Sequence, residues 1–278
     1  MNHQISPIFQ FFDQQYHLAK KDFDTLSKQF KSKKAIDLEE RLIYLEIYTD
    51  LLSRIHFDEK KLKFQLFNPF KPIFKCLKMV LHIKLTQKAL LDASGKKRAI
   101  YGSYEQFLNK EKNKLYISTY DLIISTPLEI WDELYKEAYD HSIGLKPLMI
   151  NTSTTQIINE ELDFFKYDSQ KELGPKEIKD IYEGLQVIIT LENLRMVTGL
   201  NSTFTHEIHQ KMNILSHLLY SWYQNHLFLQ HLIFYLAQNE EIPDKKYLQL
   251  LDKIKQHKKK LTTQVVSQCQ YLFTKVLI

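Results

Sequence analysis

The chain has 278 residues, of which 44% are hydrophobic and 26% charged, so it has enough apolar material for a packed core and is not compositionally disordered. Only six glycines and seven prolines are present, which excludes an all-β sandwich or barrel rich in turns and a glycine-rich nucleotide-binding loop. The net charge is +5, but only four of the 38 basic residues are arginines; sequence-specific DNA reading, which relies on bidentate arginine contacts, is therefore disfavoured.

The sequence predicts neither a secretory signal nor a membrane span. The N-terminus lacks a basic start followed by an apolar core, and no window reaches the roughly 18 uninterrupted apolar residues of a transmembrane helix. Cys76 and Cys269 lie far apart in helix-like apolar runs, as expected for buried thiols in a reducing compartment. We therefore expect a cytoplasmic protein.

Helical periodicity dominates the first half of the chain. Apolar residues recur at spacings of three or four, and Ser6-Pro7 has the residue types of a helix start. The second expected helix has an acidic outer face that includes Glu39, and the fourth has a candidate interruption near residues 111–114. The helices expected in this half cover about residues 6–30, 36–52, 69–91, 98–125 and 126–141.

A polar segment separates the two halves of the sequence. Residues 143–155 contain a glycine, a proline and the run Asn-Thr-Ser-Thr-Thr, so this segment is predicted to be non-helical and to mark a boundary between residues 1–142 and 143–278. One expected helix follows this segment and ends near residue 174. Three further helices are expected over about residues 175–197, 201–238 and 245–275. The sequence therefore predicts an all-α protein of two packed bundles built from long antiparallel helices.

A basic stripe follows one face of the helix expected over residues 69–91. Lys71, Lys75, Lys78 and His82 are offset by four, seven and eleven residues, which return close to one direction around a helix. One interpretation is a set of surface lysines that keeps an amphipathic helix soluble. The other is an anion-binding face, which needs a matching stripe elsewhere in the protein.

The helix expected over residues 201–238 offers a candidate match. Its polar face is rich in histidine and lies opposite an apolar face that includes Met212 and Leu219. Because imidazoles bind phosphates, ligate metals and titrate near neutral pH, three interpretations stay open: polar packing between helices, contact with an anion, and metal binding. No carboxylate or cysteine completes a short zinc-ligand set with the histidines. The polar face comprises His206, Asn213, His217, Tyr220 and Gln224, with Gln210 beside them.

The sequence carries no recognisable catalytic constellation. Paired acids such as Glu160 and Glu161 are typical of caps or solvated faces, and no pair of Glu-x-x-His motifs predicts a di-iron bundle. His206 and His209 are too closely spaced for the metalloprotease motif. We therefore expect a non-enzymatic protein without a metal or cofactor. The basic run at residues 255–260 is typical of a solvated helix face, and also suits nucleic acid or an acidic lipid surface.

One segment of the second half is similar to a histidine-bearing helix of a known protein family. Residues 205–215 read Thr-His-Glu-Ile-His-Gln-Lys-Met-Asn-Ile-Leu, in which His206 matches the histidine of a motif of the form His-x-x-Arg-Lys-x-Leu-Lys. His209 and Gln210 stand at the two basic positions that follow, Lys211 is present, and Asn213 replaces the final lysine.

Two segments of the first half resemble the same family. Residues 67–82 are similar to its second helix, although Leu81-His82 stands where the family has Arg-Asp. Residues 36–52 match its opening helix in hydrophobic pattern and at Arg41. Over about residues 36–270 the chain thus resembles a divergent CHAD domain, the conserved-histidine α-helical domain.

The resemblance implies two pseudo-symmetric four-helix bundles flanking a basic cavity that binds inorganic polyphosphate. Polyphosphate or another phosphate-rich polyanion is then the expected partner, held by cationic contacts that weaken as salt is added. The alternative is a degenerate CHAD-like helical protein that binds a protein partner through exposed aromatic residues and binds no anion. The expected anion contacts are Lys71, Lys75, Lys78, His82, His206, His209, Lys211 and His217.

Overall fold

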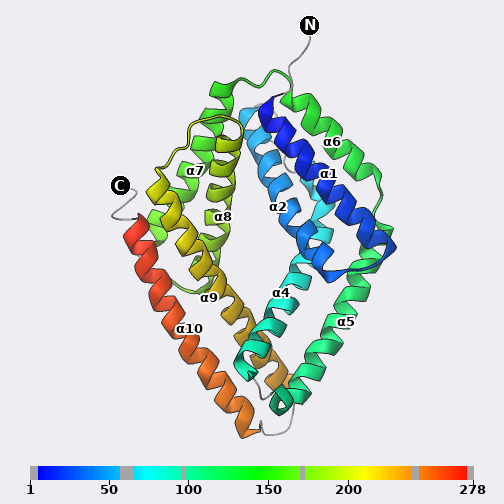
Figure 1. Cartoon of the computed structure of the whole chain (residues 1–278), viewed down its shortest axis with the longest axis vertical. Helices are drawn as coiled ribbons and strands as arrows, with labels where there is room; N and C mark the ends of the chain where they lie inside the picture. The colour runs from blue at the N-terminus through cyan, green and yellow to red at the C-terminus, as the bar shows by residue number, and fades with distance from the viewer. Residues whose placement is uncertain (1–5, 57–65, 96–97, 170–172, 239–243, 274–278) are drawn as a thin grey trace. The chain divides into compact units, whose positions relative to one another are not determined.

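The structure, a computed structural model, describes residues 6–56, 66–95, 98–169, 173–238 and 244–273 (Figure 1). All regular secondary structure in these ranges is helical, which confirms the all-α prediction. None of the described helices combines the length and the hydrophobicity that a bilayer crossing requires.

Long helices make up most of the described chain. Prolines stand at the first position of α1, α7 and α8, where the missing backbone N–H has no intrahelical partner to lose. Two short 3-10 helices, η2 (Asn68–Phe70) and η3 (Arg98–Tyr101), each lead directly into a longer helix. The α-helices are α1 (Pro7–Lys28), α2 (Ser32–Ile55), α4 (Lys71–Ser94), α5 (Gly102–Ser125), α6 (Glu129–Ser142), α7 (Pro147–Ser169), α8 (Pro175–Val197), α9 (His206–Gln238) and α10 (Lys245–Tyr271).

The chain divides into two compact units, each assembled from separated stretches of sequence. Unit 1 takes its described residues from 1–78, 116–163 and 186–205, and all others belong to unit 2. Helices α4, α5, α7 and α8 contribute residues to both units. The contacts therefore do not divide the chain at residue 143, which lies inside unit 1. A structural relationship between the sequence halves 1–142 and 143–278 stays a prediction.

Aromatic side chains fill the centre of unit 1. Trp131 of α6 is fully buried, and the ring of Phe70 lies edge-on to it with centroids 4.9 Å apart. Phe12 of α1 stacks on Tyr48 of α2 at 4.6 Å, and the Tyr16 hydroxyl donates to the Trp131 carbonyl at 2.8 Å. Burying one such side chain stabilises the fold by about 1.5–3 kcal/mol. This cluster holds α6 against the hairpin of α1 and α2.

A second hairpin, formed by α9 and α10, is the largest part of unit 2 (Figure 1). The buried side chains of α9 recur at spacings of three or four, as its apolar periodicity predicts. Trp222 lies at the interface, where its indole N–H donates to the Thr262 hydroxyl at 2.9 Å. The buried residues that the two helices contribute here include Met212, Leu215, Leu219, Leu261 and Val265.

Two of the predicted breaks in helical structure are wrong. Residues 151–155 belong to α7, because their hydroxyl groups find partners in the folded chain: the buried Thr154 side chain donates to the Ile150 carbonyl at 2.8 Å. Helix α5 is continuous through residues 111–114, where Lys114 and Glu111 form a surface ion pair at 3.3 Å. The polar side chains at these positions therefore find partners within a helical conformation, and they do not interrupt the helices.

Two further details differ from the sequence expectation. Glu39, expected on the solvent face of α2, is buried and only 5% exposed. Helix α9 begins at His206 and not near residue 201, because the Ser202 hydroxyl donates to the Glu192 carboxylate and does not cap a helix. The backbone N–H of Thr203 donates to the same carboxylate at 3.0 Å, which fixes the loop before α9.

Candidate anion-binding site

The three lysines predicted on α4 lie in its first turns, within unit 1. Lys71 and Lys75 are exposed, and Lys78 is half-buried with its ammonium 5.9 Å from the centre of the Phe74 ring. A cation so placed gains attraction from the ring while its charge still faces water. Lys71 and Lys75 are thus accessible to an anion, as the basic-stripe prediction requires.

His82, the fourth member of the predicted stripe, has a different environment in unit 2. Its Nε2 atom and the Tyr223 hydroxyl of α9 form a hydrogen bond at 2.7 Å, and the two rings meet edge-on at 5.6 Å. This bond joins residues 141 positions apart and fixes α4 against α9. The His82 side chain therefore packs α4 against α9. Its Nε2 atom could bind an anion only if the hydrogen bond to Tyr223 were broken.

The predicted residues of α9 divide between exposed and engaged side chains. His206 and His217 are exposed, whereas His209 is half-buried. Lys211 pairs with Glu207 at 2.6 Å and lies 5.2 Å from the centre of the Tyr271 ring. The bond to Glu207 raises the pKa of Lys211, and the same bond lowers the pKa of Glu207. Lys211 thus has an intramolecular counter-ion that an anionic ligand would displace.

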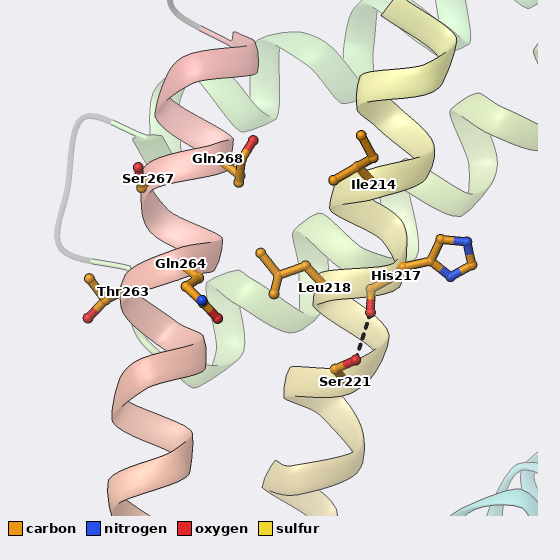
Figure 2. Close-up of a pocket in the computed structure, with 8 residues that line it drawn as sticks. All are labelled: Ile214, His217, Leu218, Ser221, Thr263, Gln264, Ser267 and Gln268. Carbon is orange, nitrogen blue, oxygen red and sulfur yellow. Dashed lines mark hydrogen bonds between the residues drawn. The ribbon is translucent and has the colours of Figure 1, made fainter.

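A shallow, open groove lies between α9 and α10 in unit 2. Figure 2 shows Leu218 and Gln264 between the two helices, while the imidazole of His217 points away from α10. The carbonyl of His217 accepts a hydrogen bond from Ser221 at 3.0 Å. Apart from His217, the groove has no titratable lining residue, so it does not suit a polyanion. Its lining comprises Ile214, His217, Leu218, Ser221, Thr263, Gln264, Ser267 and Gln268.

Positive charge is concentrated on two helices. Helix α4 carries five lysines and a single acidic residue, Asp92, and α10 carries seven lysines and a single acidic residue, Asp252. Because the net charge of the chain is only +5, the rest of the sequence is net acidic. Five exposed lysines of α10 form no ion pair with a carboxylate in the described ranges; they are Lys245, Lys253, Lys255, Lys259 and Lys260.

Arginine is used differently from lysine. Arg41 donates to the buried Asp22 at 3.0 Å, and Arg54 pairs with Glu160 at 2.8 Å. Arg195 is itself buried, 3.5 Å from the carboxylate of the buried Glu192. Each arginine side chain that the structure describes is therefore committed to an ion pair within the protein. In the described part of the chain, an anion-binding surface would therefore be formed by lysine and histidine side chains.

Sequence reasoning missed the cluster around Arg195. Its guanidinium donates to the Thr154 hydroxyl at 2.8 Å, the Asn151 side-chain oxygen at 2.6 Å and the Asn201 carbonyl at 2.9 Å. Burial alone would raise the pKa of Glu192, but donors from Ser202 and neighbouring backbone N–H groups bring it below its ordinary value. The cluster ties α7, α8 and the loop before α9 together, which is a structural role.

A second missed group lies on α9 and α10 in unit 2. The rings of Trp222 and His226 stack with centroids 4.9 Å apart and planes 11° apart, and the Lys258 ammonium lies 5.5 Å from the Trp222 ring centre. The Nδ1 atom of His226 is buried without a hydrogen-bond partner. Lys258 is half-buried, and burial lowers its pKa. The sequence shows that Trp222 and His226 are four residues apart and so lie on one face of a helix, but it does not show their contact with α10.

The remaining candidate chemistry is sparse in the described ranges. No group of three or more His, Cys, Asp or Glu residues there is arranged to hold a metal ion. Both cysteines are free thiols; burial raises the pKa of Cys269 to about 12 and also raises that of Cys76. Such thiols are poor nucleophiles at neutral pH, because the thiolate is the reactive form.

Comparison with known proteins identifies no relative. No family model matches the chain, and neither a curated protein nor a solved structure matches it. The resemblance to CHAD domains, and the pseudo-symmetry that it implies, therefore stay predictions from sequence segments.

Proposed function

We propose that this chain is a non-enzymatic binder of inorganic polyphosphate or another phosphate-rich polyanion. The observation that carries the proposal is the concentration of lysine on α4 and α10 in a chain whose other parts are net acidic. Surface lysines that serve only solubility are expected to be interspersed with acidic residues. The segment similarity to CHAD domains supports the same class of ligand.

The binding strength would come from the number of lysine contacts. Neighbouring lysines on one helix face lie about 5–6 Å apart, so several can meet one flexible polyanion. An exposed ion pair is worth only about 0–1 kcal/mol, which makes each contact weak on its own. Counter-ion release adds to these contacts at low salt. We therefore expect micromolar or weaker affinity, with a steep loss as salt is added.

The contacts divide into two groups by how accessible they are. Lys75 and the exposed lysines of α10 that form no ion pair in the described ranges need no rearrangement to meet an anion. His82 and Lys211 would first have to exchange a protein partner for the ligand. The first group should therefore dominate the salt dependence.

The test is titration with long-chain polyphosphate at several salt concentrations. The variant Lys71→Gln/Lys75→Gln/Lys78→Gln should reduce the slope of log affinity against log salt by about two, because each phosphate contact on a flexible strand contributes about 0.7. The matched control is Lys110→Gln/Lys112→Gln/Lys114→Gln on α5, which removes the same charge beside Glu111. This control should leave the slope unchanged.

Two results would overturn the proposal. One is absence of binding by the parent chain at the lowest salt concentration. The other is an equal slope for the α4 variant and the α5 control, since that would show that the α4 lysines make no contact beyond their share of the net charge. A third variant, Lys253→Gln/Lys255→Gln/Lys259→Gln, tests the lysines of α10 separately and should also reduce the slope.

The second candidate function is a protein-protein interaction module that binds no anion. It is favoured by Ile117 and Ile124 of α5, which are 64% and 53% exposed. They are seven residues apart and so share one helix face. This candidate predicts that the parent chain binds no polyphosphate even at the lowest salt concentration, and that result would replace the first proposal with it.

A further inference from the structure

The groove between α9 and α10 in unit 2 is lined by residues that suit contact with a third helix. Ile214 and Leu218 supply its apolar surface, and Ile214 is 59% exposed, so the described residues leave much of this surface open. The side chains of Ser221, Thr263 and Ser267 are short, which lets another helix approach the hairpin closely. An amphipathic helix binds such a groove through apolar residues that recur three or four positions apart.

The polar lining of the groove can also serve a bound helix. The hydroxyls of Ser221 and Thr263 donate to carbonyls of their own helices at 3.0 Å and 3.2 Å, so their donors are satisfied in the free protein. The amides of Gln264 and Gln268 have no hydrogen-bond partner among the described residues. Figure 2 shows both amides on the side of α10 that faces α9. They can therefore bond polar groups at the edge of an apolar contact.

Positive charge continues the groove along α10. Lys260 and Lys253 precede Gln264 by four and eleven residues, so the three side chains leave the helix in nearly the same direction. Both lysines are exposed and form no ion pair with a carboxylate in the described ranges. Lys259 and Lys255 precede Gln264 by five and nine residues, and they lie on the other side of α10. The groove side of α10 therefore carries two ammonium groups without a counter-ion in the described part of the hairpin.

The acidic residues of this hairpin lie elsewhere. Glu207 is the one acidic residue of α9, and it pairs with Lys211 at 2.6 Å. Asp252 is the one acidic residue of α10; it precedes Lys255 and Lys259 by three and seven residues, so it shares their face. The groove side therefore keeps its positive charge. Charge complementarity across an interface then favours a partner that is acidic.

We propose that the groove between α9 and α10 binds an amphipathic helical segment of a partner protein, with glutamate or aspartate bordering its apolar stripe. The stripe covers Ile214 and Leu218, and the acidic residues meet Lys260 and Lys253. Lys253 lies about 16 Å along the helix axis from Gln264, so a partner helix of about four turns reaches both ends. The proposal does not rest on polyphosphate binding, because a polyphosphate chain has no apolar group to place against Ile214 and Leu218.

The experiment measures the binding of a designed helical probe to the full chain by fluorescence anisotropy. The probe is a fluorescein-labelled peptide of about 18 residues, with leucines at spacings of three and four, glutamate on its polar face and a side-chain lactam that holds the helix. One control peptide has lysine in place of glutamate, and another has serine in place of leucine. We expect each control peptide to bind at least about tenfold more weakly than the acidic probe.

Two variants of α10 with the same net charge test where the acidic residues of the probe bind. Lys253→Gln/Lys260→Gln removes the lysines of the groove side and should weaken binding about fivefold, as expected for the loss of two exposed ion pairs. Lys255→Gln/Lys259→Gln removes two exposed lysines of the other side and should weaken it less than about twofold. Equal effects of the two variants would contradict the proposal, because only the net charge of α10 would then matter.

Two serine substitutions on α9 test the apolar contact. Ile214→Ser lies in the groove and should weaken binding of the acidic probe at least about fivefold. Ile233→Ser makes the same change at an isoleucine that is 46% exposed and does not line the groove, and it should weaken binding less than about twofold. Circular dichroism checks that both variants keep the helical content of the parent. An unchanged affinity of Ile214→Ser for the probe would refute the assignment of the groove.

The outcome is separable from polyphosphate binding and from self-association. Ile214→Ser should leave the polyphosphate titration unchanged, since it removes no charge. If polyphosphate binding fails while the acidic probe binds with these variant effects, the groove stands without the proposed function. If the parent chain binds polyphosphate but not the acidic probe, the groove proposal is wrong. Sedimentation that shows a dimer of the parent chain, lost in Ile214→Ser, would also overturn it, because a second copy would then cover the groove.

Discussion

The substitution Arg195→Met tests the buried cluster that joins α7, α8 and the loop before α9. The Arg195 side chain is 4% exposed and Glu192 is fully buried, so the variant leaves a buried carboxylate without its cation. It also removes the donors to Asn151 and to the Asn201 carbonyl. Methionine fills much of the volume of the lost side chain, so the effect should come from charge and hydrogen bonding.

The magnitude follows from what remains around Glu192. Removing one partner of a buried ion pair typically costs about 3–5 kcal/mol. Here the carboxylate keeps the Ser202 hydroxyl and the Thr203 N–H as donors, which places the expected loss at the lower end, about 3 kcal/mol. The exposed pair of Arg54 and Glu160 gives the control, since Arg54→Met should cost about 1 kcal/mol or less.

Urea unfolding followed by circular dichroism and tryptophan fluorescence measures both variants. Trp131 reports on unit 1, which contains Arg195, and Trp222 reports on unit 2. The double variant Glu192→Gln/Arg195→Met should recover part of the loss, because it no longer buries an unpaired charge. A loss for Arg195→Met as small as that for Arg54→Met would refute the reasoning.

Two further predictions concern buried side chains with and without partners. Tyr48→Phe removes a hydroxyl bonded to Ser142 at 2.7 Å and should lower the free energy of unfolding by about 1 kcal/mol, whereas Tyr44→Phe on the same helix removes a buried hydroxyl without a partner and should cost nothing or stabilise; equal losses in urea unfolding would contradict this. Cys269 is fully buried with its pKa raised to about 12, so it should react with a thiol reagent only after unfolding, while the half-buried Cys76 reacts faster; equal rates in native buffer would show that the environment of Cys269 is misassigned.

The helices were predictable where their signals are local. The start of α8 at a proline agrees with the sequence expectation, because a proline is favoured in the first turn of a helix. The segment 151–155 was not predictable in the same way. Its hydroxyl groups look like loop residues in isolation, and the Arg195 side chain that Thr154 meets is 41 positions away.

The candidate site was likewise predictable from the sequence only where its signal is local to one helix. A lysine stripe on α4 is visible at helical spacing, since it depends only on the geometry of one helix. The sequence does not show the contacts that change how a residue is interpreted. His82 contacts Tyr223, and Lys258 contacts Trp222, in each case between helices that are distant in sequence. Periodicity therefore identified faces of single helices, and the structure shows which of their side chains are already engaged.

The division of labour between arginine and lysine connects the fold with the proposed function. Arginine has a rigid, multidentate donor group that suits a fixed acceptor set, and each described arginine side chain meets a carboxylate in this protein. Lysine is a mobile point charge, and its concentration on α4 and α10 suits a ligand that offers many equivalent anionic groups at variable positions. A loss of arginine from a surface therefore does not by itself remove anion binding; it shifts the binding from fixed geometry to dependence on charge and salt.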